Sequence, residues 1–147
     1  IDGTFFEEYP KLDTDRKVLN GWMYSIIGMH DYLKIATKET DVFLDQKKKL
    51  YEDSIITLIN NLKNYNIYYW STYCQPNSIF NICSIHYQIQ HITFLNAMYH
   101  ITERSEFRSF SRKLLFQFYN PLFRILSLFS KLLISNVFKY GRLYKSK

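Results

Sequence analysis

Glycine, proline and cysteine are all scarce in this chain: its 147 residues contain four Gly, three Pro and two Cys. An all-β domain needs frequent turns, so the shortage of turn-forming residues argues against that fold class. The two cysteines, Cys74 and Cys83, do not have the spacing of a CxxC metal site. We expect them to be reduced structural thiols, and a disulfide around the loop between them is the alternative.

An apolar leader segment is missing as well. Residues 1–14 are acidic and lack the apolar run of a signal peptide, so none is expected. The first residue is Ile1 rather than Met, which suggests a fragment or a truncated version of a longer chain. A length of 147 residues is enough for one domain with one hydrophobic core.

Acidic side chains are absent from the C-terminal part of the sequence. Up to Glu106 there are ten Lys/Arg and thirteen Asp/Glu, a net charge of −3, whereas the residues beyond Glu106 contain nine Lys/Arg and no acid. The overall charge of +6 therefore comes from a basic tail. The net negative body disfavours nucleic acid as a partner, and the sequence contains no recognised nucleic-acid motif.

Apolar residues make up 47% of the chain and aromatic residues 18%, which is typical of a folded domain. Helical spacing of the apolar residues predicts five helices, and the aromatic stretch 65–73 predicts a short strand or hairpin arm. Because helices joined by short links pack as antiparallel hairpins, the predicted fold is all-α, a partial α/α toroid with a short aromatic β insertion. We divide the chain into a helical domain, 1–119, and a C-terminal helix, 120–147. The predicted helices cover residues 16–37, 40–64, 84–101, 106–119 and 121–140.

Two glycines, Gly21 and Gly28, stand seven residues apart in the first predicted helix. Each lowers the stability of that helix by roughly 1 kcal/mol relative to alanine. Their position on one stripe of the helix suggests the close approach of another helix or of a ligand.

The stretch 84–92 is the centre of the sequence, because its apolar residues have helical spacing and Tyr87 and His91 are four residues apart. On a helix the phenol and the imidazole share one face, where they can donate, accept and transfer protons. The simpler interpretation is an aromatic helix whose polar tips find partners at the edge of the core.

Four segments, taken in order, resemble a single family. They are Phe-Phe-Glu-Glu-Tyr-Pro at 5–10, the run 18–32 that begins Val-Leu-Asn-Gly-Trp, Tyr-Trp-Ser-Thr-Tyr at 69–73, and His-Tyr at 86–87 followed by His-Ile at 91–92 and Glu-Phe at 106–107. Over about residues 4–118, the sequence resembles the C-terminal catalytic domain of D-glucuronyl C5-epimerases. These enzymes convert glucuronate to iduronate within heparosan or heparan chains. The resemblance implies a uronate-containing polysaccharide as partner, and no metal ion or organic cofactor is indicated.

By this resemblance, Tyr87 matches a tyrosine that the family uses in catalysis, and Glu8 and Tyr9 match the Glu-Tyr pair of its Glu-Tyr-Pro motif. The same segments suggest further residues that bind the substrate or line its pocket, with a histidine stabilising the substrate carboxylate. These substrate-binding candidates are Asn20, Tyr24, Trp70, His86 and His91.

The sequence departs from the family pattern in several places. The animal enzymes carry a Tyr-Asp-Leu-Arg run before the catalytic helix, but the equivalent region here is Trp-Ser-Thr-Tyr at 70–73, so an arginine that would hold the substrate carboxylate is missing there. The family's histidine after the tyrosine is displaced, since His86 precedes Tyr87 and Gln88 follows it. The family's N-terminal β-domain has no counterpart in these residues, and a full toroid needs several more helices. These departures bear on substrate identity more than on reaction type.

Epimerisation at C5 removes the proton beside the uronate carboxylate and returns one to the opposite face, which requires a base on one side of the ring and an acid on the other. The carbanion puts extra negative charge on the carboxylate, so nearby donors must stabilise it. We predict that Tyr87 and Tyr9 transfer the protons, with Glu8 acting as a base or tuning Tyr9, and either tyrosine can serve either face. Two alternatives stay open: a lyase that uses the same carbanion, and a non-catalytic domain that associates with polysaccharide.

The tail 121–147 has the pattern of an amphipathic helix with a basic polar face, and Lys131 and several serines interrupt its apolar run too early for a membrane span. One interpretation is a core helix that closes the domain. The other is a helix on an anionic membrane surface, near a polymer made at that membrane. The second would place the protein at the cytoplasmic face of a bacterial membrane, or in the Golgi lumen of a eukaryote. A homodimer is a further expectation.

Overall fold

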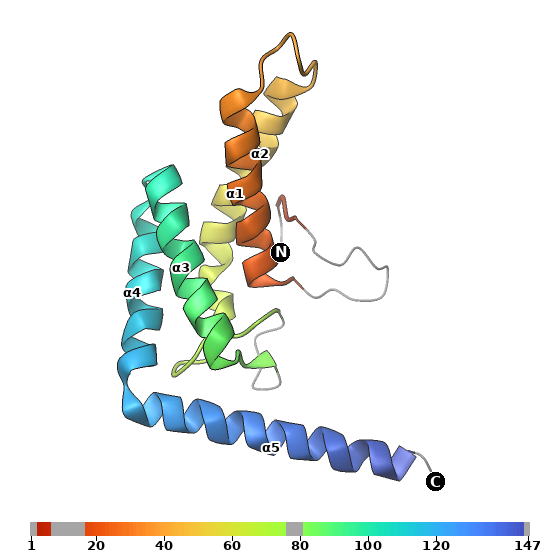
Figure 1. Cartoon of the computed structure of the whole chain (residues 1–147), viewed down its shortest axis with the longest axis vertical. Helices are drawn as coiled ribbons and strands as arrows, with labels where there is room; N and C mark the ends of the chain where they lie inside the picture. The colour runs from red at the N-terminus through yellow and green to blue at the C-terminus, as the bar shows by residue number, and fades with distance from the viewer. Residues whose placement is uncertain (1–2, 7–16, 76–80, 146–147) are drawn as a thin grey trace.

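The computed structural model (Figure 1) describes residues 3–6, 17–75 and 81–145, with side chains as far as residue 134. These residues form five α-helices, and a short 3₁₀ turn, Leu62–Tyr65, continues the second of them. The helices are α1 (Leu19–Ile35), α2 (Leu44–Asn61), α3 (Ile85–Thr102), α4 (Ser105–Tyr119) and α5 (Pro121–Lys145).

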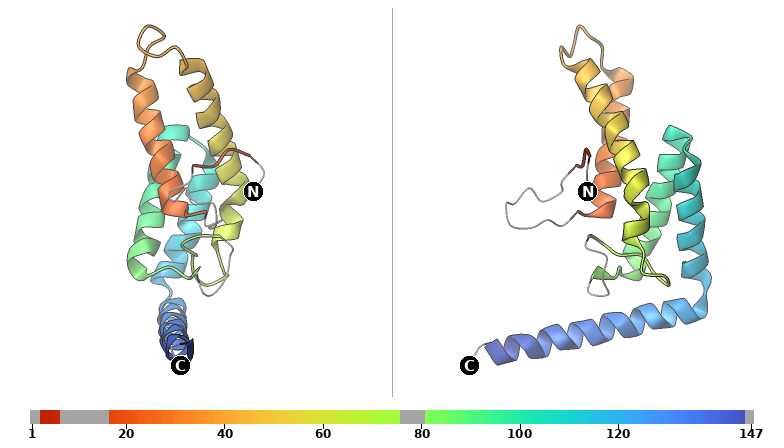
Figure 2. Two further views of the ribbon diagram at one scale, coloured as in Figure 1. Left: turned by 90° about the vertical axis from the view of Figure 1, so that its right-hand side faces the viewer. Right: turned by 180° about the vertical axis from the view of Figure 1, so that it is seen from behind.

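The first four helices form the body of the domain as two antiparallel hairpins, α1 with α2 and α3 with α4 (Figures 1 and 2). The two hairpins meet mainly where α1 packs on α3. Helix α5 turns away after α4 and runs crosswise beneath one end of this body. The all-α class is therefore confirmed, whereas the toroid is not confirmed by the five helices of the described residues.

The main core lies between the two hairpins and is centred on Trp22, which is fully buried. Its indole N–H donates to the Ser54 hydroxyl at 2.8 Å, which satisfies the buried indole and links α1 to α2. The ring of Phe5 packs edge-on against Trp22, with centroids 4.5 Å apart. Thr4 N–H also donates to the hydroxyl of Thr57 at 3.2 Å, so residues 3–6 are held against the α1–α2 hairpin.

The aromatic stretch after α2 is irregular, so the predicted β insertion is not confirmed. In the described parts of 66–84 the backbone pairs through isolated antiparallel bridges, Asn66 with Ser71 and Thr72 with Ile82, rather than through a strand. Polar side chains explain this local structure, because Asn66 donates from its amide to the Trp70 carbonyl and accepts from the Tyr68 N–H. Tyr68 has a φ of 75°, which turns the chain sharply at that point.

Two smaller predictions can be compared with the structure. Cys74 and Cys83 are buried free thiols, as expected. Gly28, in contrast, has no neighbouring atom within 4 Å of the position that a Cβ would occupy, so the predicted close approach of a helix does not occur there.

Candidate functional site

Tyr87 lies in the first turn of α3, at the end of the body that α5 crosses. Ser84 caps this helix, because its hydroxyl accepts a hydrogen bond from the backbone N–H of Tyr87 at 3.3 Å. The cap fixes the start of the helix and with it the direction of the Tyr87 side chain. Tyr87 is half-buried, so its ring packs on the protein while part of it stays accessible.

The ring of Tyr73 packs edge-on against Tyr87, with centroids 4.7 Å apart and an interplanar angle of 63°. The backbone holds Tyr73 from both sides: its N–H donates to the Asn81 carbonyl at 2.7 Å, and its carbonyl accepts from the N–H of Leu19 at 3.1 Å. Tyr73 therefore joins the start of α1 to the start of α3.

A pocket of about 290 Å³ opens beside this tyrosine pair. Its wall comes from the irregular segment, from the start of α3 and, through Lys131, from α5. The lining residues are Tyr73, Cys74, Asn81, Ile82, Cys83, Ser84, Tyr87 and Lys131.

Helix α5 is tied to this place by a hydrogen bond of 2.8 Å between the hydroxyls of Ser130 and Tyr69. The next residue, Lys131, is the one that reaches the pocket. Among the residues that the structure describes, no carboxylate forms an ion pair with Lys131. Its charge is therefore available to an anionic ligand.

The surroundings of the pocket favour an anion in a second way. Helices α1 and α3 run in the same direction, and both begin at this end of the body (Figure 1). The start of a helix carries a partial positive charge. Two helix starts and Lys131 thus give a positive field at one end of a body whose sequence up to Glu106 is net negative.

The thiol of Cys83 lines the pocket but is unsuited to proton transfer. Burial raises the pKa of Cys83 to about 12, against smaller lowering effects from a hydrogen bond with Ser71 and from the charge of Lys131. The thiol therefore stays protonated at neutral pH.

Asn20 and Tyr24 lie one turn apart on α1, on the helix that packs beside α3. The amide oxygen of Asn20 is buried and has no hydrogen-bond partner among the described residues. Tyr24 is 68% exposed, and its ring lies 6.2 Å from that of Phe94 on α3. Tyr24 is therefore accessible near the start of α1, whereas Asn20 is half-buried and its amide oxygen is not accessible.

His86 and His91 lie in different environments. His86 is exposed, and its Nε2 is 3.1 Å from the side-chain amide of Gln90. His91 is completely buried, and its Nδ1 lies 3.0 Å from the hydroxyl of Ser71. Since that hydroxyl donates its proton to the side-chain oxygen of Gln88, it accepts from Nδ1–H of His91, which sets the tautomer.

Burial also decides the charge of His91. Desolvation lowers its pKa to about 3, so the imidazole is neutral at physiological pH. Its Nε2 atom is buried without a hydrogen-bond partner in the described structure. His91 thus holds the irregular segment to α3 and does not reach the surface where a polymer would bind.

Trp70 is also fully buried, and its indole N–H donates to the carbonyl of Cys83 at 3.1 Å. This bond holds the backbone of Cys83, which lines the pocket, from the side away from the pocket opening. As with His91, the structure places Trp70 in packing contacts rather than in reach of a polymer.

Glu8 and Tyr9 lie outside the described residues. The described chain on either side of them is well anchored: Phe6 lines a shallow recess on α1, and the carbonyl of Lys17 accepts from the N–H of Gln75 at 3.1 Å. Gln75 directly follows Cys74, a lining residue of the tyrosine pocket. Lys17, the first described residue after them, therefore lies beside the stretch of chain that contributes Cys74 to the pocket.

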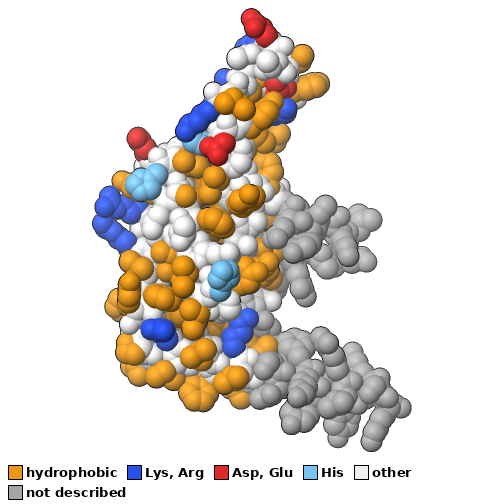
Figure 3. All heavy atoms as spheres, in the orientation of Figure 1, with side chains coloured by type: hydrophobic (Ala, Val, Ile, Leu, Met, Phe, Trp, Pro, Cys, Tyr) orange, Lys and Arg blue, Asp and Glu red, His pale blue; other side chains and the backbone are white. Residues whose placement is uncertain are grey.

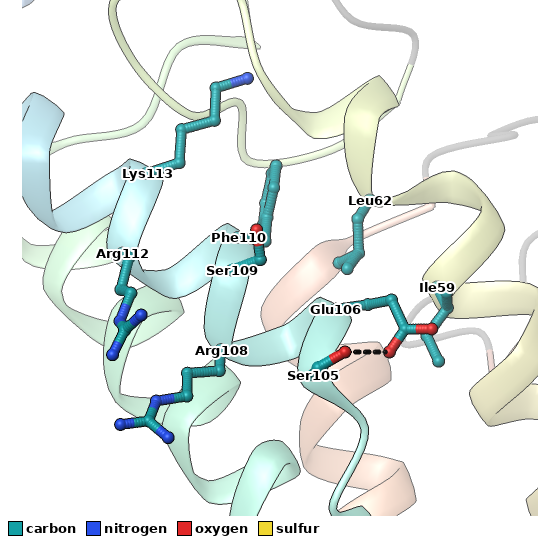
Figure 4. A pocket seen from close by; sticks show the side chains of 9 residues that line it. All are labelled: Ile59, Leu62, Ser105, Glu106, Arg108, Ser109, Phe110, Arg112 and Lys113. Carbon is teal, nitrogen blue, oxygen red and sulfur yellow. Dashed lines mark hydrogen bonds between the residues drawn. The ribbon is translucent and has the colours of Figure 1, made fainter.

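A more open groove of about 700 Å³ lies between the end of α2 and the start of α4 (Figure 4). Arg108 and Arg112 extend to one side of it, and the carboxylate of Glu106 accepts a long hydrogen bond of 3.4 Å from the Ser105 hydroxyl. Neither a tyrosine nor a histidine lines this groove, and none of the predicted site residues does so. Its lining residues are Ile59, Leu62, Ser105, Glu106, Arg108, Ser109, Phe110, Arg112 and Lys113.

Two pocket residues to which we assign a role, Tyr73 and Lys131, were not among the site residues predicted from the sequence. Tyr73 belongs to a segment that resembles the family, and its spacing from α3 carried no signal that the two rings would touch. Lys131 was assigned only to the polar face of the tail. Lys131 and Tyr87 are 44 positions apart and line the same pocket because of the way α5 crosses the body. Helical periodicity does not determine that crossing.

The described residues hold no group of three or more His, Cys, Asp or Glu side chains placed to bind a metal ion. Residues 1–115 match the sequence profile of one family, described as D-glucuronyl C5-epimerase C-terminus. A search of curated proteins finds no significant match. The matched region contains Tyr87 and Tyr73 but ends before Lys131.

Proposed function

The chain belongs to the D-glucuronyl C5-epimerase C-terminal family, and on that premise we propose that it epimerises glucuronate residues at C5 within a polysaccharide, at the pocket beside Tyr87. The observation that supports the proposal is that the Tyr87–Tyr73 pair and Lys131, which has no carboxylate partner among the described residues, line one pocket. A phenol can exchange a proton with a carbanion, and a lysine can hold the carboxylate next to that carbanion.

The reaction begins when a base removes the C5 proton, and the electron pair left on C5 delocalises into the carboxylate. A proton then returns to C5 from the opposite face of the ring. The base ends protonated and the acid ends deprotonated, so exchange with solvent must restore both before the next turnover. We assign one of the two faces to the phenol of Tyr87, and Tyr73 holds the ring of Tyr87 in place.

Lys131 supplies the cation that the missing arginine would have supplied. The carboxylate gains negative charge in the carbanion, so a fixed positive charge beside it stabilises that state more than the ground state. The starts of α1 and α3 add to this field. In this assignment the charge comes from α5, beyond the region shared with the family.

The second face requires a group opposite Tyr87, and Tyr9 with Glu8 is our candidate. Support comes from the match of the Glu-Tyr-Pro motif and from the anchoring of Lys17 next to Cys74. Tyr9→Phe and Glu8→Gln should each lower turnover more than they weaken substrate binding. Tyr24 and His86 are exposed and are our candidates for further sugar contacts, whereas the amide oxygen of Asn20 is buried and is not assigned one.

The experiment that tests this function is incubation of the protein with a glucuronate polymer in deuterated water. Deuterium at C5 together with new iduronate signals in the NMR spectrum supports epimerisation. An unsaturated uronate product would identify a lyase that uses the same carbanion. A folded protein that produces neither outcome would be a non-catalytic domain, and the proposal would fail.

A further inference from the structure

Helix α5 presents an unusual surface to the body of the domain. The residues of its first half that are buried are serines, Ser127 and Ser130, and the second of them forms the hydrogen bond to Tyr69. Phe123 and Ile134 are half-buried on the same side. The core-helix interpretation of the tail predicts leucines along this contact, so that interpretation does not describe how α5 packs.

Seven large apolar side chains in the described half of α5 point outward instead, with between 49% and 67% of each exposed. They cover the side of the helix opposite the two serines. Phe116 and Tyr119, at the end of α4, are also exposed. Figure 3 shows this apolar band along the lower edge of the molecule, where α5 lies. Its members on α5 are Leu122, Ile125, Leu126, Leu128, Phe129, Leu132 and Leu133.

The charges around this apolar face all have one sign. Arg124 is exposed on one edge of the described half of α5, Lys131 on the same edge reaches the pocket, and the sequence beyond Glu106 contains nine cations and no acid. An apolar face with a cationic border is complementary to a layer that is apolar inside and anionic at its surface. A single helix 25 residues long extends roughly 38 Å, enough for many lipid contacts in one plane.

We propose that the outward face of α5 binds flat on an anionic lipid surface. A second copy of this chain is a poorer occupant, because its own α5 face is bordered by cations and the sequence beyond Glu106 offers no acid to pair with them. Among the described residues, each helix is too short or too polar to cross a bilayer. Bound in this way, α5 keeps its serine side on the body and leaves Lys131 at the pocket. The proposal does not depend on the reaction assigned to that pocket.

The test is co-sedimentation of the full chain with phosphatidylcholine vesicles that contain or lack phosphatidylglycerol, at low and high salt. We expect binding to the anionic vesicles that weakens in high salt. The double variant Phe129→Asn, Leu133→Asn should bind at least about tenfold more weakly, because it removes two large apolar side chains from the face. The control is Ile35→Asn, which removes an even more exposed apolar side chain at the end of α1, and it should bind as the wild type does.

Three results would overturn the proposal. One is a wild-type chain that stays in solution with anionic vesicles. Another is a double variant that binds as tightly as the wild type. The third is a dimer that depends on Phe129 and Leu133 and is not displaced by anionic vesicles, which would assign the face to a second copy. Circular dichroism of each variant shows whether the fold is intact, and both substituted side chains are already exposed.

Discussion

Tyr87 and His91 are one helical turn apart on α3, yet their surroundings have almost nothing in common. Tyr87 is half-buried at an open pocket, beside a second phenol and near a lysine. His91 is completely buried, and a hydroxyl and a thiol contact its Nδ1. Their spacing of four residues predicts that both lie on one face of the helix. The neighbours that pack on that face decide which side chain meets solvent and which becomes part of the core.

The largest effect that separates the two residues should be on stability. His91→Ala removes the partner of Ser71 and leaves a cavity, so we expect a loss of about 2–4 kcal/mol in the free energy of unfolding. His86→Ala, on the exposed side of the same helix, should change it by less than about 0.5 kcal/mol. Denaturant unfolding of both variants measures this difference. Equal stabilities would mean that His91 is not the core residue described here.

A smaller effect is expected on catalysis, at the pocket beside Tyr87. Lys131→Gln removes the proposed carboxylate cation, and we expect kcat/KM for a soluble uronate oligosaccharide to fall about tenfold or more. The matched control is Arg124→Gln, two turns earlier on α5 and outside the pocket lining. If both variants retain wild-type kinetics, Lys131 has no part in substrate recognition.

The free energy of unfolding should also depend on pH, through the buried imidazole of His91. The pKa of His91 is about 3 in the folded chain and about 6.5 when unfolded, so below pH 6.5 the unfolded state takes up a proton that the folded state does not. Stability should therefore decrease as the pH falls from about 6.5 toward 3, by up to about 1.4 kcal/mol per pH unit from this residue. Unfolding measured across this range, for the wild type and His91→Gln, isolates the contribution as the difference between the two slopes. Parallel slopes would show that His91 titrates normally.

The smallest effect concerns the helix that faces α3. Gly28→Ala should stabilise the chain by about 0.5–1 kcal/mol, because the new Cβ enters open space in the interior of α1. Gly3→Ala is the contrasting variant, since Gly3 has a φ of 123° and a Cβ there would collide with the side chain of Thr57. Thermal unfolding compares the two. A destabilised Gly28→Ala chain would mean that a neighbour occupies this space.

Local pattern was enough to predict much of the fold. All five helices follow from apolar spacing and from breaks such as Asn120–Pro121, and their observed ends differ from the predicted ones by a few residues. The aromatic stretch misled because β-propensity ignores side chains such as Asn66 and Gln117, which hydrogen-bond to the backbone and to each other and replace a strand ladder. Only tertiary packing separates these outcomes.

The candidate site was predictable to a lesser degree. Tyr87 could be selected because a motif surrounds it. Trp70 and His91 lie in the same motifs, but they are buried by contacts that the sequence does not reveal. Lys131 could not be found from sequence, since it reaches the pocket from a helix that no motif connects to Tyr87. The amphipathic pattern of α5 was correctly recognised, but the pattern alone left open which side of the helix faces the body.

The most direct test of the account is C5 deuterium exchange by Tyr87→Phe. The variant keeps the aromatic ring that packs on Tyr73 and removes only the phenolic hydroxyl group, so its thermal unfolding should match that of the wild type. We expect exchange into a glucuronate polymer to fall by at least about 100-fold, the range typical for loss of a general acid or base. Exchange at the wild-type rate in a folded Tyr87→Phe protein would contradict the central claim that this phenol transfers the C5 proton.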